Sequence, residues 1–431
     1  MLRILILFIM GCVMTVAAKE EIYIKKLPNG VKAIIKERPD TKAVAVQVWF
    51  GVGSIYENDQ ERGLSHFLEH MLFNGTKYTK PGEIEFEIEK KGGHINAATS
   101  FDFTYYHIEI ADIFWKTALK YLYYMTTAPS LSDDMVKKEK PIVLEELNRH
   151  LDDPKNLLWD EYYKLAYKKT NYKHPVIGYR ETIENYTPEL VRNYFYSHYT
   201  PNNTTVVVVG NINKDEVLNE IEKTFGTVKG KKYTPPQVEL EDPQTDIRTA
   251  VIKKKQITRG YVVIGWQAPS IRDKKSFTAQ ILEEILANGK SSVIYQELKE
   301  KGYVQSIFGG YMAHAGTSQF IFYMITDPDK IDKAKEKLFE IIKDYAKNGF
   351  DKEAVENAKR RIINRETFAR EEVDDEADSI GYAVTVARDI NYDIKYLENI
   401  KKVSKEDVDN FVREFLKDNN YTEVRLLPED K

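Results

Sequence analysis

The sequence holds one cysteine, Cys12, among its 431 residues. A single thiol cannot form an intrachain disulfide, and it cannot build a metal site from several cysteines. Because Cys12 lies in an N-terminal segment that we expect to be removed, the mature chain would also have no cysteine nucleophile. The chain also lacks a large excess of charge of either sign, since 63 basic and 67 acidic residues give a net charge of −4. Such a balance offers nucleic acid no basic surface, and we expect no nucleic-acid partner.

A hydrophobic run long enough to cross a membrane, about 20 residues, is missing as well. The apolar run at residues 4–16 is shorter, follows a basic start and leads into the small residues that a signal peptidase accepts. We predict a signal peptide at residues 1–18 and export to the periplasm or the medium. Two alternatives would hold the chain at a membrane: lipidation of Cys12, for which Met10 fits the pattern poorly, and retention of the segment as an anchor.

The most informative feature that is present is the pentapeptide His66-Phe67-Leu68-Glu69-His70. At about 100° per residue in a helix, His66, Glu69 and His70 fall within one narrow sector, and the residues between them face the opposite side. Two imidazoles at i and i+4 can bind one Zn²⁺, and a carboxylate between them can take a proton from metal-bound water. This is the inverted order of the H-E-x-x-H motif. The alternative is a surface helix whose polar face happens to carry two histidines.

A catalytic zinc needs a third protein ligand and an open position for water. Candidates lie in residues 139–147, where Glu139 and Glu146 are about two helical turns apart and project from the same side of a helix. Glu145 points roughly a quarter-turn away. One of the two stacked carboxylates can ligate the metal while the other orients a ligand. Taken alone, the segment could equally be a solvated acidic helix.

Residues 53–76, which contain the histidine motif, closely resemble the zinc site of the pitrilysin/insulinase metallopeptidases. The likeness is greatest to their shorter, processing-peptidase-type branch and runs through nearly the whole chain. In that family the third ligand follows the second histidine by about 76 residues, and 146 − 70 = 76 selects Glu146. The resemblance therefore implies one Zn²⁺ per chain, bound by His66, His70 and Glu146. It further implies that Glu69 is the general base and that Glu139 supports the site.

The second part of the chain repeats the first. Residues 280–289 align with residues 66–75 at an offset of 280 − 66 = 214, and residues 404–411 align with residues 187–194 at an offset of 404 − 187 = 217. Two similar offsets at distant points indicate duplication of one unit. Gln280 and Glu284 replace the two histidines, so only the first copy can hold this metal.

A stretch rich in glycine, proline and lysine divides the two copies. We predict an N-terminal zinc-binding domain at residues 19–226, a linker at 227–247 and a homologous non-metal domain at 248–431. The expected fold class is α+β, with two homologous halves that each hold a mostly antiparallel sheet flanked by helices. The family resemblance implies that the halves close like a clam-shell around a chamber.

Local patterns place several elements. Residues 22–24 and 31–35 flank a Pro-Asn-Gly turn and predict a hairpin. Residues 43–50, 104–110 and 206–209 have the composition of strands. Thr187 before Pro188 is a good helix start. The aromatic segment at residues 159–167 fits a packed helix face better than a binding platform. We assign structural roles to His94, His107, His150 and His174, which have no helical partner at ligand spacing.

Substrate binding rests on the resemblance. Residues 92–99 resemble the family's edge strand, where Asn96, Ala97 and Ala98 would contact an extended peptide through strand addition. The alternative is a Gly-rich turn before an ordinary strand. Phe73 could line the pocket for the residue after the scissile bond, or it could be an ordinary packing aromatic.

One departure from the family concerns an Arg and a Tyr of the second half, which bind the substrate carbonyl and the oxyanion. At residues 297–306, Lys299 stands near the Arg position, Gln305 replaces the Tyr, and Tyr303 is not equivalent. We therefore expect a zinc endopeptidase for peptides or unfolded segments that needs a homologous, zinc-less partner in a heterodimer, with a homodimer as the alternative. A non-catalytic assembly or binding subunit of the same fold is the competing interpretation.

Overall fold

The computed structural model describes residues 22–239, 241–255 and 257–429. The predicted signal peptide and Cys12 lie outside these residues. The structure holds two sheets, and all neighbouring strands pair antiparallel except β2 with β6 and β7 with β11. The first sheet has the order β1 (Tyr23–Lys26), β2 (Lys32–Glu37), β6 (Thr204–Gly210), β3 (Ala43–Phe50), β5 (Thr104–Ala111), β4 (His94–Thr99). The second has the order β7 (Arg248–Lys254), β11 (Thr422–Pro428), β8 (Gly260–Ala268), β10 (Ser318–Thr326), β9 (Ser306–Met312).

Helices flank both sheets, and the expected α+β class is confirmed. The first half contains α1 (Leu64–Phe73), α2 (Glu83–Glu89), α3 (Trp115–Thr127), α4 (Asp133–Asp152), α5 (Pro154–Ala166), α6 (Arg180–Asn185), α7 (Pro188–His198) and α8 (Lys214–Lys223). The second contains α9 (Lys275–Leu286), α10 (Ile331–Asn348), α11 (Lys352–Ala369), α12 (Val373–Tyr382), α13 (Asn391–Ile394), α14 (Tyr396–Lys402) and α15 (Lys405–Phe415). Among the described helices, none combines the length and the apolar character that a membrane crossing requires.

The two sheets share one strand order. The series β2-β6-β3-β5-β4 of the first sheet corresponds, strand by strand, to β7-β11-β8-β10-β9 of the second. In chain order α1 therefore corresponds to α9, and α4 and α5 correspond to α11 and α12. Strand β1 has no counterpart on β7. Between Thr227 and Arg248 the described residues form neither helix nor strand.

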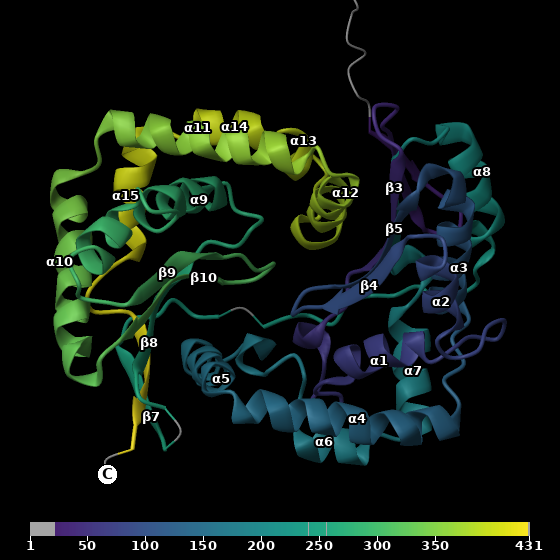
Figure 1. Ribbon diagram of the computed structural model, residues 1–431, viewed down its shortest axis with the longest axis horizontal. Coiled ribbons are helices and arrows are strands. Elements are labelled where there is room, and N and C mark those ends of the chain that lie inside the picture. The colour runs from purple at the N-terminus through teal and green to yellow at the C-terminus, as the bar shows by residue number, and fades with distance from the viewer. Residues whose placement is uncertain (1–21, 240, 256, 430–431) are drawn as a thin grey trace, which may run out of the picture.

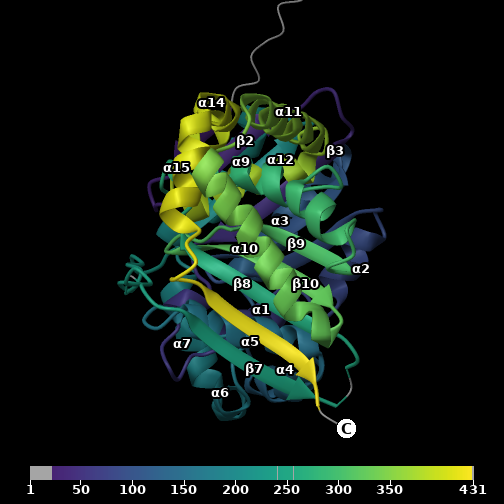
Figure 2. The ribbon, with the colours of Figure 1, turned by 90° about the vertical axis from the view of Figure 1, so that its left-hand side faces the viewer.

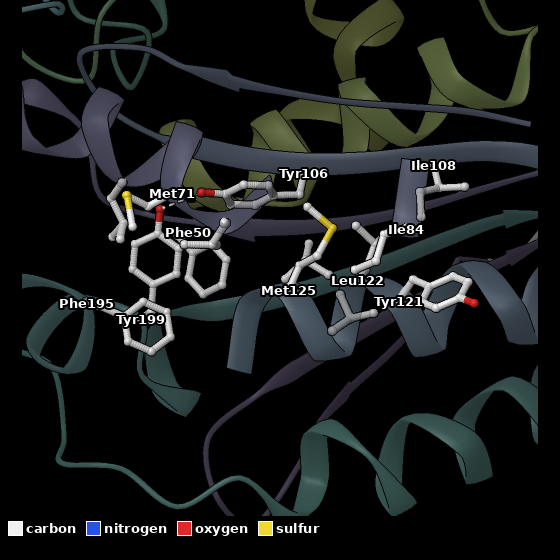
Figure 3. Close-up of a cluster of buried hydrophobic side chains, with 14 of the residues drawn as sticks. Phe50, Met71, Ile84, Tyr106, Ile108, Tyr121, Leu122, Met125, Phe195 and Tyr199 are labelled. Carbon is white, nitrogen blue, oxygen red and sulfur yellow. Dashed lines mark hydrogen bonds between the residues drawn. The ribbon is translucent and has the colours of Figure 1, made fainter. Parts of the chain in front are cut away.

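Each sheet is buried on both faces. In β3, Val44, Val46 and Val48 join the core under α1 and α3, while Ala45 and Trp49 enter a second cluster on the opposite face. Figure 3 shows part of the first core, where Tyr106 and Ile108 of β5 meet Leu122 and Met125 of α3. A strand buried on both faces is expected to be an apolar run, as residues 43–50 are.

The second face of each sheet is covered by a helix from the other half. Helix α12 packs against β3 and β6 of the first sheet, and α5 packs against β7, β8 and β11 of the second. Figure 1 shows these two helices between the halves, with the second half on the left. Helices α10, α11, α14 and α15 cover the outer side of the second half (Figure 2). Each half therefore contributes one helix to the hydrophobic core of the other.

Several local predictions are confirmed. β1 and β2 form an antiparallel hairpin in which Gly30 adopts φ 105°, a conformation that favours glycine. Thr187 caps α7, with its side chain accepting from the N–H of Leu190 at 3.1 Å. Residues 159–167 lie on and just after α5, where Tyr162 and Tyr167 are fully buried against the second sheet.

Candidate metal centre

Helix α1 is anchored so that one face meets the core and the other stays partly open. Phe67, Leu68 and Met71 are fully buried, which leaves the histidine face turned away from the core. The helix begins after Gly63, which cannot supply a side-chain cap. The buried carboxylate of Glu57 takes that place, because the N–H groups of Gly63 and Ser65 donate to it at 2.8 and 2.7 Å. Burial outweighs these bonds and raises the pKa of Glu57 to about 7.

Helix α4 brings the acidic residues to the same place. Its N-cap Ser132 accepts from the N–H of Met135. Val136, Val143 and Leu147 are buried along one side, and α4 packs directly against α1. Glu139 and Glu146 project toward α1, whereas Glu145 is exposed. The two carboxylates therefore lie on either side of the His70 ring, and Glu146 also reaches His66.

The three predicted metal ligands converge. Glu146 Oε2 lies 3.3 Å from His70 Nε2, and Glu146 Oε1 lies 3.6 Å from His66 Nε2. One ligand atom from each residue lies within 4.8 Å of the others, and no other such group of three occurs in the described part of the chain. Ligand atoms at about 2.1 Å from a tetrahedral zinc would stand roughly 3.4 Å apart. The residues present therefore fit a zinc ion without rearrangement of the helices.

Supporting contacts orient His70. Its Nδ1 lies 3.0 Å from Glu139 Oε1, and Asn74 Nδ2 donates to Glu139 Oε2 at 2.6 Å. A carboxylate behind a histidine in this way fixes which ring nitrogen is free for the metal. Burial alone would lower the pKa of His70, but its bonds to Glu139 and Glu146 outweigh it and raise the pKa to about 9.

His66 has the opposite electrostatic environment. Burial lowers its pKa to about 4, and its Nδ1 has no hydrogen-bond partner among the described residues. The imidazole is therefore neutral near pH 7, which is the form that binds metal.

Glu69 lies on the same face of α1 and is held by β4. The hydroxyl of Thr99 donates to Glu69 Oε2 at 2.5 Å, which leaves Oε1 for a proton. Burial raises the pKa of Glu69, and the bond from Thr99 offsets part of that rise. A carboxylate with a raised pKa beside a metal-competent triad is suited to general-base chemistry.

The predicted substrate contacts lie along one edge of the first sheet. β4 pairs only with β5, so its other edge is free within the described chain. Asn96 is exposed and its Oδ1 accepts from the N–H of Ala97. Ala97 packs on the core, and Ala98 points to the opposite side of the sheet. Phe73 is half-buried at the end of α1, with its ring 6.4 Å from that of Tyr106. Substrate binding by these four residues stays a prediction.

Three supporting residues were not assigned roles from the sequence. Thr99 fixes Glu69, Asn74 fixes Glu139 and Glu57 caps α1. Asn74 follows the motif by one helical turn and could have been suggested by that spacing. Thr99 and Glu57 reach α1 only through the packing of β4 and of the loop before the helix, and sequence periodicity carries no signal for either.

The corresponding place in the second half is occupied by ion pairs between side chains. Counted from the helix N-caps Ser132 and Asp351, Glu146 corresponds to Arg365, because 146 − 132 = 365 − 351 = 14. Glu284, at the position of His70, accepts from Arg361 and Arg365 at 2.7 Å each. A guanidinium thus stands in the second half where Glu146 stands in the first. That only the first copy binds this metal stays a prediction.

The residues at the family's Arg and Tyr positions make local contacts. Lys299, in the π-helical turn η6 (Tyr295–Lys299), places its ammonium 4.9 Å from the ring centre of Tyr295. Gln305 is exposed and donates to Asp327 Oδ1 at 3.2 Å. Neither residue is an Arg or a Tyr that could serve an oxyanion.

The other histidines lie outside the triad. His107 pairs with Asp374 and His150 with Asp160. His174 Nδ1 lies 2.8 Å from the hydroxyl of Tyr179. The ring of His94 packs edge-on to His107.

Comparison with known proteins gives the family. Residues 32–180 match the model described as insulinase (peptidase family M16), and residues 185–362 match the model described as peptidase M16 inactive domain. The three predicted metal ligands lie within the first match. The second match begins in α6, although β6 still completes the first sheet.

Relatives and solved structures agree with these matches. The uncharacterized zinc protease YmxG of Bacillus subtilis is 28% identical over 335 residues, which are 78% of this chain and 81% of the relative. The zinc protease PqqE of Helicobacter pylori is 27% identical over 410 residues, 93% of this chain and 92% of the relative. A crystal structure of a protease from Helicobacter pylori superposes with a TM-score of 0.91 at 25% identity, covering 95% of this chain and all of that one. This chain belongs to the insulinase family of peptidases, M16.

Proposed function

We propose that this chain is a zinc endopeptidase that hydrolyses peptides or unfolded polypeptide segments. The single observation that carries the proposal is the convergence of His66, His70 and Glu146 at distances that suit one tetrahedral zinc. The names of the relatives, which are zinc proteases, support it.

In this proposal a bound zinc would polarise the scissile carbonyl and lower the pKa of the attacking water. Glu69 takes the proton from that water and later gives it to the leaving amine. Thr99 holds one oxygen of Glu69 in place, so the other is presented to the water. Glu139 and Asn74 keep His70 aligned throughout. The free edge of β4 would pair with the backbone of an extended substrate, and this mode of binding would favour unfolded segments.

The chain's own residues do not complete the oxyanion site, since Lys299 and Gln305 stand at the positions of the expected Arg and Tyr. We propose that a homologous, zinc-less partner supplies this pair in a heterodimer. The match of residues 185–362 to an inactive domain is compatible with such an arrangement. An oxyanion donor lowers the activation barrier by about 3–4 kcal/mol, so the chain without its partner would hydrolyse peptides hundreds of times more slowly.

The metal site is tested by zinc content and peptide hydrolysis together. Glu69→Gln is expected to keep one zinc and to lose hydrolysis, because it removes the base and no ligand. Glu146→Ala is expected to lose zinc. Glu145→Ala, one position away on the same helix and exposed, is the matched control and should keep both zinc and activity. Parental hydrolysis by Glu69→Gln would remove that residue from the mechanism.

The competing function is a non-catalytic assembly or binding subunit, which the absence of the Arg/Tyr pair favours. Peptide assays of the chain with and without a co-expressed homologue that carries the pair would separate the two. Activity that appears with the partner, falls with a chelator and requires Glu69 supports the peptidase. Zinc binding without hydrolysis in either case supports the subunit, and full activity of the chain alone contradicts the need for a partner.

We also propose that residues 1–18 are a signal peptide, which directs export and is then removed. The mass of the mature N-terminus in the producing cell would distinguish cleavage from lipidation at Cys12.

A further inference from the structure

A cavity of about 230 Å³ lies where three parts of the chain meet. The first half contributes Lys32 from β2 and Asn203 from the turn before β6, and the connecting segment contributes Tyr233. The second half contributes Thr385 and Arg388, which follow α12. Among the described residues, no acidic side chain lines this cavity. Whatever binds there would touch both halves and the segment that joins them.

The two cations of this cavity are not neutralised. Within the described residues Lys32 has no hydrogen bond or ion pair, and Arg388 has one contact, from Nη2 to the hydroxyl of Tyr56 at 3.5 Å. Burial, together with the charges of Lys26 and Arg388, lowers the pKa of Lys32. Lys32 is partly buried and Arg388 is exposed, and an anion bound between them would offset the repulsion of their like charges.

Neutral donors and free space accompany the charges. Tyr233 is 8% exposed, yet within the described chain its hydroxyl has no hydrogen-bond partner, and neither does the hydroxyl of Thr385. Both belong to residues that line the cavity, and buried polar groups are normally satisfied. At Gly51 a Cβ would lie 3.1 Å from Asn203 Oδ1 and 3.8 Å from Thr385 Cγ2, so the absence of a side chain there keeps the cavity open.

The backbone at Arg388 is also unusual. Its φ of 58° lies in the left-handed region, which few residues other than glycine adopt. Such a conformation costs free energy, and residues that adopt it cluster at functional sites. Here it accompanies a cation that no described carboxylate neutralises.

We propose that this cavity binds an oxyanion of the phosphate class between Lys32 and Arg388. A guanidinium can bind phosphate through two parallel hydrogen bonds, an ammonium adds a point charge, and hydroxyl groups donate to the remaining oxygens. Because the ligand bridges the halves, its binding stabilises the seam between them. The site is separate from the zinc triad, and the proposal does not depend on peptidase activity.

A second cavity beside the first would give room for a longer oxyanion. It measures about 220 Å³, shares Arg388 and Pro235 with the first, and adds Arg272. Its one acidic residue, Asp102, already accepts from the hydroxyl of Tyr172 and the N–H of Ala315. A chain of phosphates could therefore extend from the first cavity past Arg388 toward Arg272.

The test is the thermal unfolding of the full chain with excess chelator present, so that phosphate cannot act through zinc. Inorganic phosphate and tripolyphosphate are compared with chloride at the same ionic strength. At ten times the dissociation constant, phosphate is expected to raise the Tm by about 2 °C beyond chloride. The double variant Lys32→Gln/Arg388→Gln should lose this rise. Lys42→Gln, an exposed cation elsewhere in the first half, should keep it.

The outcomes are distinct. A larger rise with tripolyphosphate than with phosphate supports a ligand that spans both cavities, and an equal rise supports the first cavity alone. If the double variant does not fold, Gly51→Ala carries the test, since it fills the cavity without a change of charge and should reduce the rise at least twofold. A rise no greater than that with chloride, or an undiminished rise in the variants, overturns the proposal.

Discussion

At the scale of single residues, Gln47 of β3 and two aspartates of α12 form a polar contact between the halves. Gln47 Nε2 donates to Asp374 Oδ1 at 2.9 Å and to Asp378 Oδ1 at 2.8 Å. His107 Nδ1 lies 3.2 Å from Asp374 Oδ2. Burial and the negative charge of Asp374 raise the pKa of Asp378 to about 6. Asp374 therefore has an imidazole beside it, whereas the partners of Asp378 are the amide of Gln47 and the hydroxyl of Tyr105.

This imbalance predicts a stabilising substitution. Asp378 binds its proton more tightly in the folded chain than in the unfolded chain, where its pKa is near 3.8. Folding stability should therefore fall as the pH rises from about 4 to above 6. Asp378→Asn removes the charge and should raise the free energy of unfolding at pH 8 by about 2 kcal/mol, with little effect at pH 4. Urea unfolding at both pH values measures it. Asp375→Asn, exposed on the same helix, is the control, and a pH-independent effect would contradict the assignment.

A second residue-scale prediction concerns Glu139. Because its carboxylate holds His70 Nδ1 at 3.0 Å, Glu139→Gln should weaken zinc binding by about 10- to 100-fold. The zinc dissociation constant, measured by competition with a chelator, checks this. Glu145→Gln should leave it unchanged. An unaltered zinc affinity in Glu139→Gln would show that Glu139 does not orient His70 for the metal.

At the scale of elements, the contact between α12 and β3 depends on one glycine. A Cβ at Gly381 would lie 2.2 Å from Nε1 and Cε2 of Trp49. The indole cannot move freely, because it stacks on Tyr105 at 4.1 Å and donates to Gln47 Oε1 at 2.8 Å. At this point α12 lies so close to β3 that residue 381 has no room for a side chain.

Gly381→Ala therefore separates two physical effects. Helix propensity alone would make alanine more stable by about 1 kcal/mol, whereas the clash with Trp49 should cost about 1–3 kcal/mol and prevail. We expect a net loss in the free energy of unfolding, measured with urea. The loss should shrink when Trp49→Phe is added, since the smaller ring leaves room. A Gly381→Ala variant that is more stable than the parent would show that the space between α12 and Trp49 can accommodate a methyl group.

The sequence predicts features that depend on neighbouring residues better than contacts between residues far apart in the chain. The bounds of β3 and the cap at Thr187 could be read directly, because alternation, apolar runs and capping are local. The pairing of His66 with Glu146 across helices came from a family resemblance, since helical periodicity alone left the choice of carboxylate open. The covering of the first sheet by α12 and the bond from Thr99 to Glu69 were not foreseen. Both join residues far apart in the chain, and no periodic pattern records such contacts.

At the scale of the whole molecule, the exchange of α5 and α12 makes each half depend on the other. Without α12, the face of the first sheet that carries Ala45, Trp49 and Val207 would be open to water. Without α5, the second sheet would expose Val263 and Ile321. Ion pairs add to this contact, as Glu376 of α12 accepts from Arg38 at 2.7 Å and also pairs with Lys36. Burial of apolar surface on this scale contributes about 25 cal/mol per Å², so neither half retains its full stability alone.

The chain should therefore unfold in one cooperative step despite its two sheets. Calorimetry of the full chain is expected to give a single transition whose calorimetric and van't Hoff enthalpies agree. Gly381→Ala, although it alters only the contact on the first sheet, should shift that whole transition to lower temperature, because loosening α12 weakens both halves at once. Two separated transitions, or a shift confined to part of the heat signal, would show that the halves fold independently and that the exchanged helices contribute little to holding them together.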